Sequence, residues 1–398
     1  MTDSSLGGPD GGSRDATTAS LSVLLLRDQR EQRVRSMERF ADELERGLVE
    51  NAGLAVRSTT IRASPLARLP VFGGLDPLVA RNVRYPLAAG RRRADVFHII
   101  DQAYGQLALA LPRDRTIVTC HDLMLLRNDP WTPALGAGAL TRMRYRWATS
   151  FLRRVAAVAC PSEATAEDVH DLLGVPRQRL RVITQGVAAT FRPTETVQAE
   201  PALRGASGRS IVLHVSTGQA YKNVPATLEV VAGLARGESD VALVRVGVPL
   251  SDSEREHAVR LNVADRIIEL GHIPDEALVG IYNRADVLLF PSFWEGFGWP
   301  ALEAMACGTP VVASNCAALR ALIGDVGLLA APTDVAALTV AVRSILVSPA
   351  TATRLRNAGL ERAAAFKWSR TATEYARLYD EVAASARPIR RLEAGRSV

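Results

Sequence analysis

The stretch "FPSFWEGFGWPALEAMACGTPVVAS", residues 290–314, contains the end of a strand, a short loop and a helix in direct succession. The run "ADVLLFPS" that leads into it is continuously apolar, as in a strand buried on both faces. The loop "FWEGFG" follows, and "WPALEAMAC" predicts a helix because Pro300 suits a first helical turn and Gly308 suits a helix end. Strand, loop and helix in this order form the repeating unit of a parallel α/β sheet.

The same alternation of apolar runs and longer helical stretches extends outward in both directions. Continuous apolar strands separated by helices predict parallel sheets with both faces covered. We therefore expect an α/β protein with two doubly wound, Rossmann-like domains that face each other across a cleft. The predicted strands are "LSVLLL", "DVFHII", "RTIVTCHDL", "VAAVACPS", "LRVITQGV", "SIVLHVS", "VALVRVG", "RIIELG", "ADVLLFPS" and "TPVVAS".

A length of 398 residues exceeds the usual size of a single core, which also favours two domains. We place the N-terminal domain at 21–190, a linker rich in Pro, Gly and polar residues at 191–209, and the C-terminal domain at 210–370. Residues 371–398 predict a helix that packs back on the N-terminal domain. Residues 1–20 are small and polar, without the pattern of a signal peptide, and predict a disordered tail. No apolar run is long enough to span a bilayer, so we expect a cytoplasmic protein.

The loop at 293–298 suits a bound anion. Gly296 and Gly298 lack side chains, so a phosphate could approach the backbone and the helix N-terminus, whose N–H groups and dipole favour negative charge. Glu303, one turn into the helix, could accept hydrogen bonds from a ribose attached to the phosphates. Glu295 could accept them from a sugar at the other end of a diphosphate. The alternative is that Glu303 only complements the helix dipole and Glu295 only caps the turn.

Together with its surroundings, this pattern resembles the donor site of family 4 retaining glycosyltransferases of the GT-B architecture. Their Glu-x7-Glu signature is matched by Glu295 and Glu303, and "VTCHDL", "VSTGQAYKN" and "FKWSRTATEYARLYDEV" also fit, so the resemblance covers residues 95–385. It implies a nucleoside-diphosphate sugar bound by the C-terminal domain and an acceptor bound by the N-terminal domain. It also implies transfer with retention, without a cofactor or an essential metal.

The resemblance leaves both substrates open. The acceptor is a saccharide, a lipid-linked sugar or a small molecule, as in polysaccharide biosynthesis. GDP-mannose is our guess for the donor, because relatives with a "VGT...KN" loop resemble "VSTGQAYKN". The hypothesis is therefore a hexosyltransferase, and specifically a mannosyltransferase.

Three further residues follow predicted strands, at the edge where ligands of open α/β sheets bind. Lys222 is one of two lysines in the chain, and its charge would stabilise the departing β-phosphate, unless it is an exposed loop cation. Thr217 stands where many relatives carry a phosphate-binding arginine. The resemblance implies that His121 contacts the transferred sugar, and the alternative is a structural histidine at a strand end. We predict catalytic roles for Lys222, Glu295 and His121, and donor contacts for Thr217, Lys222, Glu295, Gly296, Phe297, Gly298 and Glu303.

Some features depart from the family. The segment after the first strand lacks the glycine-rich loop of many relatives, so Arg27, Ser36 or Arg39 could bind the acceptor instead. Ala321 stands where relatives carry a glutamate. These departures keep two alternatives open, namely a sugar-nucleotide epimerase or hydrolase of GT-B fold, and a catalytically silent sugar-nucleotide-binding protein. The four cysteines match no zinc or redox spacing and predict buried thiols, namely Cys120, Cys160, Cys307 and Cys316.

The formal net charge of +6 reflects arginine clusters in the N-terminal half, at 91–93, in "RMRYR" at 142–146, and at 153–154. Such clusters either remain solvated or contact phosphates of a lipid surface. Peripheral contact with the inner membrane face is therefore one expectation. Nucleic acid is not an expected partner, because no aromatics interleave with the arginines and no nucleic-acid-binding module is present.

Overall fold

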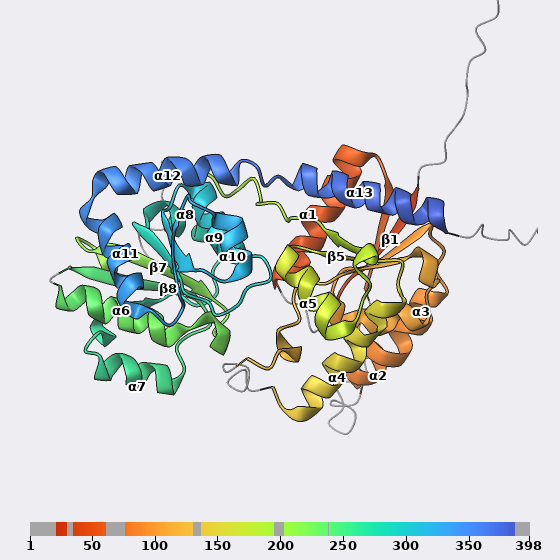
Figure 1. The fold of residues 1–398 in the computed structure, drawn as a ribbon, viewed down its shortest axis with the longest axis horizontal. Coiled ribbons are helices and arrows are strands. Elements are labelled where there is room, and N and C mark those ends of the chain that lie inside the picture. The colour runs from red at the N-terminus through yellow and green to blue at the C-terminus, as the bar shows by residue number, and fades with distance from the viewer. Residues whose placement is uncertain are drawn as a thin grey trace, which may run out of the picture.

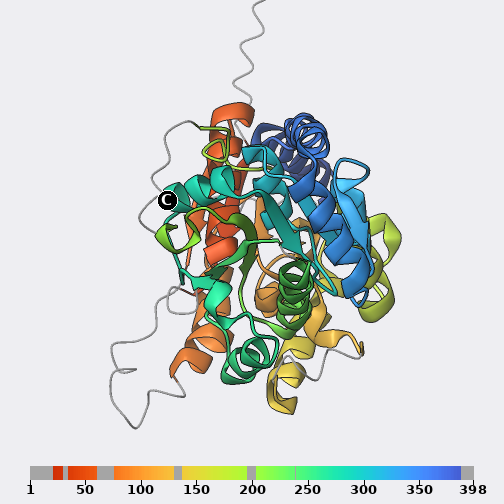
Figure 2. The same cartoon turned by 90° about the vertical axis from the view of Figure 1, so that its left-hand side faces the viewer.

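The structure, a computed structural model, describes residues 21–29, 35–60, 76–129, 137–194, 203–237 and 239–386, so the predicted tail at 1–20 lies outside the described residues. Two lobes lie side by side, each built on a six-stranded parallel sheet (Figure 1). Figure 2 looks along the line that joins the lobes, with the C-terminal lobe in front. The predicted GT-B class is confirmed, because both sheets are parallel and carry helices on both faces.

The N-terminal sheet has the strand order β2-β1-β3-β4-β5-β6. Its central strands are short and fully buried, as their apolar sequences predicted. The strands are β1 Ser22–Leu26, β2 Ala55–Thr59, β3 Val96–Ile99, β4 Thr116–Thr119, β5 Ala157–Cys160 and β6 Leu180–Val182. The main helical segments are α1 Arg35–Ala52, α2 Asp76–Val79, η3 Ala80–Arg84, α3 Tyr85–Gly90, η4 Gln102–Leu109, α4 Ala139–Thr149, η8 Ser150–Arg154 and α5 Glu163–Leu173.

The C-terminal sheet has the order β12-β11-β10-β7-β8-β9, so β10 and β7 lie at its centre. The strands are β7 Ser210–Ser216, β8 Val241–Gly247, β9 Ile267–Glu269, β10 Val287–Phe290, β11 Val311–Ser314 and β12 Leu328–Ala330. The helices are α6 Val224–Arg236, α7 Asp252–Arg260, α8 Asp275–Arg284, α9 Trp299–Cys307, α10 Ala317–Ile323, α11 Val335–Val347 and α12 Pro349–Ala363.

The last helix, α13 Trp368–Ser385, leaves the C-terminal lobe and lies along the N-terminal one, beside α1 (Figure 1). Phe40 and Leu44 of α1 pack with Tyr375 and Tyr379 of α13 and with one face of the N-terminal sheet. Residues 387–398 lie outside the described part of the chain. The N-terminal domain is therefore completed by residues from both ends of the chain.

The chain crosses between the lobes twice, and the two crossings pair with each other. Val187 forms an isolated parallel bridge with Lys367, and its N–H donates to the carbonyl of Phe366 at 3.1 Å. The segment predicted as a linker, 191–209, is partly packed, because Phe191 and Leu203 are buried in the C-terminal core. Residues 195–202 within it lie outside the described residues.

Three cysteines are buried as expected, but Cys316 is only half-buried because it lies at the N-cap of α10. Within the described ranges, no single helix has the length and hydropathy to cross a membrane. The pair α11 and α12 meets those criteria together but is bent by 101°. Both helices contribute to the C-terminal core, for example through Val342 and Leu355.

Candidate functional site

A cavity of about 520 Å³ lies between the domains, at the carboxyl ends of β4 and β7 and at the start of α9. Its walls come from both lobes, as Ser36 and Arg39 of α1 face residues of the C-terminal loops. All eight residues predicted from the sequence line this cavity: His121, Thr217, Lys222, Glu295, Gly296, Phe297, Gly298 and Glu303. The structure thus brings together side chains that are up to 182 positions apart, from His121 to Glu303 (303 − 121).

Lys222 and Glu295 form a buried ion pair. Lys222 Nζ lies 2.7 Å from Glu295 Oε1, and the two residues are 7% and 6% exposed. Burial by itself would lower the pKa of Lys222, but the Glu295 carboxylate outweighs it and the pKa is raised. The ammonium also lies 5.0 Å from the centre of the Phe290 ring. Lys222 is therefore buried and charged. The alternative that it is an exposed loop cation is wrong.

Glu303 binds groups from both domains. It accepts a hydrogen bond from the Tyr282 hydroxyl at 2.9 Å and pairs with Arg39 of α1. Arg39 also donates to Asp275 at 2.7 Å, at the start of α8. Burial raises the pKa of Glu303, while Arg39 and Tyr282 act in the opposite direction. The carboxylate therefore depends on an arginine from the opposite domain.

The expected acceptor role for Arg39 is not what its contacts suggest. Its guanidinium lies over Trp299 at 5.9 Å and over Phe191 at 5.4 Å, and it pairs with the carboxylate predicted to bind ribose. Arg27 is directed elsewhere, because it pairs with Asp42 at 2.5 Å on the face of α1. The sequence could not reveal the Arg39 contact, because Glu303 follows 264 positions later.

The two glycines have a packing role within the protein, and the approach of an anion to their backbone stays a prediction. A Cβ on Gly296 would lie 2.1 Å from the His121 carbonyl oxygen, so the absent side chain lets the two domains meet. The Gly296 carbonyl also accepts from Ser162 Oγ of the N-terminal domain at 2.8 Å. Gly298 has a φ of +107°, and a Cβ there would lie 2.5 Å from Leu319. The glycines thus allow close packing of protein against protein, while their backbone still lines the cavity.

Phe297 and Thr217 line the cavity in different ways. The Phe297 ring is buried in the C-terminal core and packs edge-on against Phe366, with ring centres 6.1 Å apart. Thr217 is exposed and hydrogen-bonds the buried Tyr221, whose pKa burial raises to about 12. Among the described residues, Lys222 and Arg39 are the basic side chains that line the cavity apart from histidines. Arg39 is thus the arginine that shares this cavity with Thr217 in the described part of the chain.

His121 has both ring nitrogens engaged by protein. Nε2 lies 2.9 Å from the Ile100 carbonyl oxygen, which can only accept, so Nε2 carries the proton. Nδ1 then accepts from Gln185 at 3.1 Å. Burial lowers the pKa of His121, which favours this neutral form. A ring fixed in this way can position neighbouring groups, but it has no free nitrogen to remove a proton.

The comparison with known proteins follows this geometry. The family model for glycosyl transferases group 1 matches residues 199–362, and the model for Glycosyltransferase Family 4 matches residues 37–191. The glycogen synthase of Mycobacterium tuberculosis is 31% identical over 298 residues, which are 72% of this chain and 69% of that protein. The chain belongs to glycosyltransferase family 4.

Two further similarities, one in sequence and one in fold, extend over more of the chain. O-antigen chain mannosyltransferase B of Escherichia coli is 27% identical to this glycosyltransferase over 342 residues, 80% of this chain and 84% of that protein. HepE from Anabaena, solved in complex with UDP and glucose, superposes with a TM-score of 0.70 at 20% identity. That superposition covers 91% of this chain and all of HepE (100%).

Asp122 of this glycosyltransferase is not among the residues that the sequence predicted for the site. It accepts from the Met124 N–H at 3.1 Å, and it also lines the cavity. Burial raises the pKa of Asp122 to about 6, the charges of Asp101 and Glu295 add to the effect, and Lys222 opposes it. The sequence could have indicated this role, because Asp122 directly follows the predicted site residue His121.

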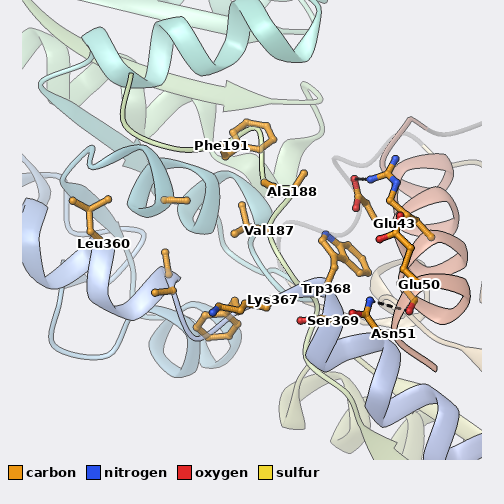
Figure 3. A pocket seen from close by; sticks show the side chains of 17 residues that line it. Glu43, Glu50, Asn51, Val187, Ala188, Phe191, Leu360, Lys367, Trp368 and Ser369 are labelled. Atoms are coloured by element: carbon orange, nitrogen blue, oxygen red, sulfur yellow. Dashed lines mark hydrogen bonds and ion pairs between the residues drawn. The ribbon is translucent and has the colours of Figure 1, made fainter. Parts of the chain in front are cut away.

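A second cavity of about 570 Å³ lies at the hinge of the glycosyltransferase (Figure 3). Figure 3 shows Glu43, Glu50 and Asn51 of α1 on one side and Phe191 and Leu360 on the other, and Trp368 lies between them. None of the eight predicted residues lines it. The predicted donor-site residues are therefore collected by the cavity between the domains and not by this one. Across the described ranges, no group of three or more His, Cys, Asp and Glu side chains is placed to hold a metal ion.

Proposed function

We propose that this family 4 glycosyltransferase transfers a hexosyl group from a nucleoside-diphosphate sugar to a hydroxyl group, with retention at the anomeric carbon. The acceptor is a saccharide, a lipid-linked sugar or a small hydroxylated molecule. The single observation that carries the proposal is the buried Lys222–Glu295 pair, 2.7 Å apart, at the start of the helix that holds Glu303. A cation, two carboxylates and a helix N-terminus around one cavity suit a sugar diphosphate.

Each end of the proposed donor has its own partners. Glu303 accepts from the ribose hydroxyls, and the backbone at the start of α9 faces the diphosphate. Lys222 stabilises the charge that grows on the β-phosphate as the glycosidic bond breaks, which lowers the barrier more than it strengthens ground-state binding. Glu295 orients Lys222 and accepts from hydroxyls of the transferred sugar.

The proton of the acceptor hydroxyl passes to the leaving phosphate in this proposal. His121 is unsuited to take it, because its Nε2–H donates to Ile100 and its Nδ1 accepts from Gln185. Transfer on the same face of the sugar then retains the anomeric configuration, and holding both substrates in the closed cleft supplies the orientation. His121 contributes by positioning the sugar through the loop it anchors.

GDP-mannose is the first donor to test, with UDP-glucose as the comparison. A mannosyltransferase is among the relatives, while HepE was solved with UDP and glucose. A thermal-shift screen of GDP, UDP, ADP and their sugars identifies the base, because a ligand at 100 times its Kd adds roughly 2.7 kcal/mol to stability. Proton NMR of the product then reads the anomeric configuration, and EDTA should leave the rate unchanged.

The outcomes separate the proposal from its alternatives. Glycosyl transfer to an added acceptor, with the donor's configuration kept, supports it. Donor hydrolysis that acceptors do not redirect supports a hydrolase, and isomerised sugar nucleotide supports an epimerase. Tight donor binding without any turnover over an acceptor panel would indicate a silent binding protein.

A further inference from the structure

Helix α4 carries its apolar side chains on the outside. A helix on a globular domain normally buries its apolar face, but the buried residues of α4 are only Ala148 and Thr149. Leu140, Met143 and Trp147 are instead 63%, 61% and 44% exposed. Their spacing of three and four positions places them on one face of the helix. Exposed large apolar side chains grouped in this way mark an interaction surface.

The same helix is strongly basic. Arg144 and Arg146 make no ion pair within the described residues, and Trp147 packs edge-on against Phe151, over which Arg154 lies at 5.7 Å. Arginines beside an exposed tryptophan combine positive charge with an amphipathic ring, which is the composition of helices that lie at a membrane surface. The long arginine side chains can extend toward phosphates while the apolar residues insert.

A neighbouring segment repeats the pattern. Val83 of η3 and Leu87 of α3 are 50% and 55% exposed and four positions apart. Both α3 and α4 pack against η4, and both views place α2 to α4 at the same end of the N-terminal lobe (Figures 1 and 2). Residues 80–94 and 137–154, which hold η3, α3, α4 and η8, contain ten arginines and no Asp or Glu, while the short α2 before them begins with Asp76. Because the charge of these segments is positive, the partner should be an anionic surface. A zwitterionic or basic surface would provide no electrostatic attraction.

We propose that α4, with the adjoining α3 segment, docks this enzyme on an anionic lipid bilayer. Leu140, Met143 and Trp147 enter the interface, and the flanking arginines contact lipid phosphates. Tyr145 of α4 connects this face to the cleft, because its hydroxyl donates to the Asp122 carbonyl at 2.9 Å. Docking would thus place the mouth of the cleft close to the lipid surface, where a lipid-linked acceptor is presented. The proposal does not depend on which sugar is transferred.

Sedimentation of the full chain with vesicles tests the proposal. With phosphatidylcholine vesicles that contain about one third phosphatidylglycerol, the wild type should bind, and it should remain in solution with pure phosphatidylcholine. Replacing Leu140, Met143 and Trp147 by Ser should abolish binding. Arg144→Gln with Arg146→Gln should weaken it about tenfold or more, at roughly fivefold for each arginine.

Matched variants in the C-terminal domain provide the control. Ser at Val259, Val340 and Val347, which are 62%, 64% and 68% exposed, should leave binding unchanged, as should Arg354→Gln with Arg356→Gln. Quenching of Trp fluorescence by brominated acyl chains should occur in the wild type and decrease in Trp147→Phe. Thermal unfolding of each variant establishes that it is folded.

Several results would overturn the proposal. One is a wild type that stays in solution with anionic vesicles, and another is equal loss of binding in the α4 and control variants. Concentration-dependent dimerisation that disappears in the α4 triple variant, without vesicle binding, would assign this face to a second copy of the chain. Equal binding to neutral and anionic vesicles would contradict the proposed contact between the arginines and anionic lipids.

Discussion

The two carboxylates of the loop and helix after β10 are buried to nearly the same extent, 6% for Glu295 and 5% for Glu303, but their cations come from different domains. Glu295 pairs with Lys222, which belongs to the same domain and follows its central strand β7. Glu303 pairs with Arg39, which belongs to α1 of the other domain. One half of the site is therefore complete within the C-terminal domain, while the other half exists only when the domains meet.

The largest effect on activity is expected from changing Lys222, in the half of the site that is complete within the C-terminal domain. Lys222→Ala should lower kcat by roughly two to three orders of magnitude, because it removes a preorganised charge from the departing phosphate. The donor KM should rise less, and Lys222→Arg should restore part of the rate, because a planar fork fits the place of an ammonium imperfectly. Steady-state kinetics with the identified donor measure both quantities.

Lys367→Ala is the matched control, since Lys367 is the only other lysine of the chain and is exposed at the hinge. It should leave kcat unchanged. A kcat for Lys222→Ala within about threefold of the wild type would show that another group holds the phosphate.

The second prediction separates the two carboxylates. Glu303→Ala should weaken binding of the free nucleoside diphosphate roughly 10- to 100-fold, the scale of hydrogen bonds to a charged group. Glu295→Ala should leave that affinity unchanged or slightly higher, because Lys222 is released to the phosphates, and should lower kcat with the sugar donor. Calorimetric titration with the diphosphate and kinetics with the sugar donor make the distinction. Equal loss of diphosphate affinity in both variants would contradict it.

The third prediction concerns the contact that spans the domains. Arg39 lowers the pKa of Glu303, whereas burial and Asp275 raise it and the Tyr282 hydroxyl lowers it. In Arg39→Met the pKa of Glu303 should rise further, so the carboxylate becomes protonated at a higher pH and accepts ribose hydroxyls less well. Diphosphate affinity should fall about tenfold, with a larger loss at pH 5.5 than at pH 8.

Two variants control for a purely structural effect of Arg39. Adding Asp275→Asn to Arg39→Met should remove part of the pH dependence, because one of the two facing acids is gone. Arg46→Met changes an arginine on the same helix that pairs with Glu43 within that helix, and it should behave as the wild type. Loss of affinity that is the same at both pH values would show that Arg39 only holds the domains together.

Most of the fold could be predicted from the sequence, because buried parallel strands are continuous apolar runs. The ten predicted runs correspond to ten strands, and the two that were missed, β2 and β12, are edge strands. The sequence of β2, "AVRST", is largely exposed, so no apolar run marks it. Position at a sheet edge is not sufficient to hide a strand, because the edge strands β6 and β9 do carry apolar runs and were predicted.

Whether a feature of the candidate site could be predicted depends on whether its contacts lie within one domain or join the two domains. Lys222 and Glu295 could be found because each lies in the loop after a strand of one sheet, where ligands of such sheets bind. Glu303 could be found because it lies about one turn into the helix that follows the second loop. Arg39 was named only as a candidate for binding the acceptor, and its contact with Glu303 could not be predicted because it depends on how two separately folded domains meet. The packing requirement for Gly296 could not be predicted for the same reason, since the missing side chain avoids the His121 carbonyl of the other domain.

The smallest predicted effect concerns Asp122, whose ionisation in the cleft should lower the free energy of unfolding as the pH rises. The pKa of Asp122 is raised to about 6 in the folded protein, above its usual value near 3.9 in an unfolded chain. The folded state therefore holds the proton more tightly, and stability is lost as the pH rises through 6. Asp122→Asn lacks this loss but keeps the acceptor for the Met124 N–H. The variant should be more stable than the wild type at pH 8 by roughly 1–2 kcal/mol, less than the full shift because Asp122 is only partly buried.

The difference should shrink at pH 5, and an exposed control, Asp171→Asn, should show none. Thermal unfolding at both pH values measures it, and a stability gain that is equal at pH 5 and pH 8 would mean that Asp122 does not carry a buried charge in the closed cleft.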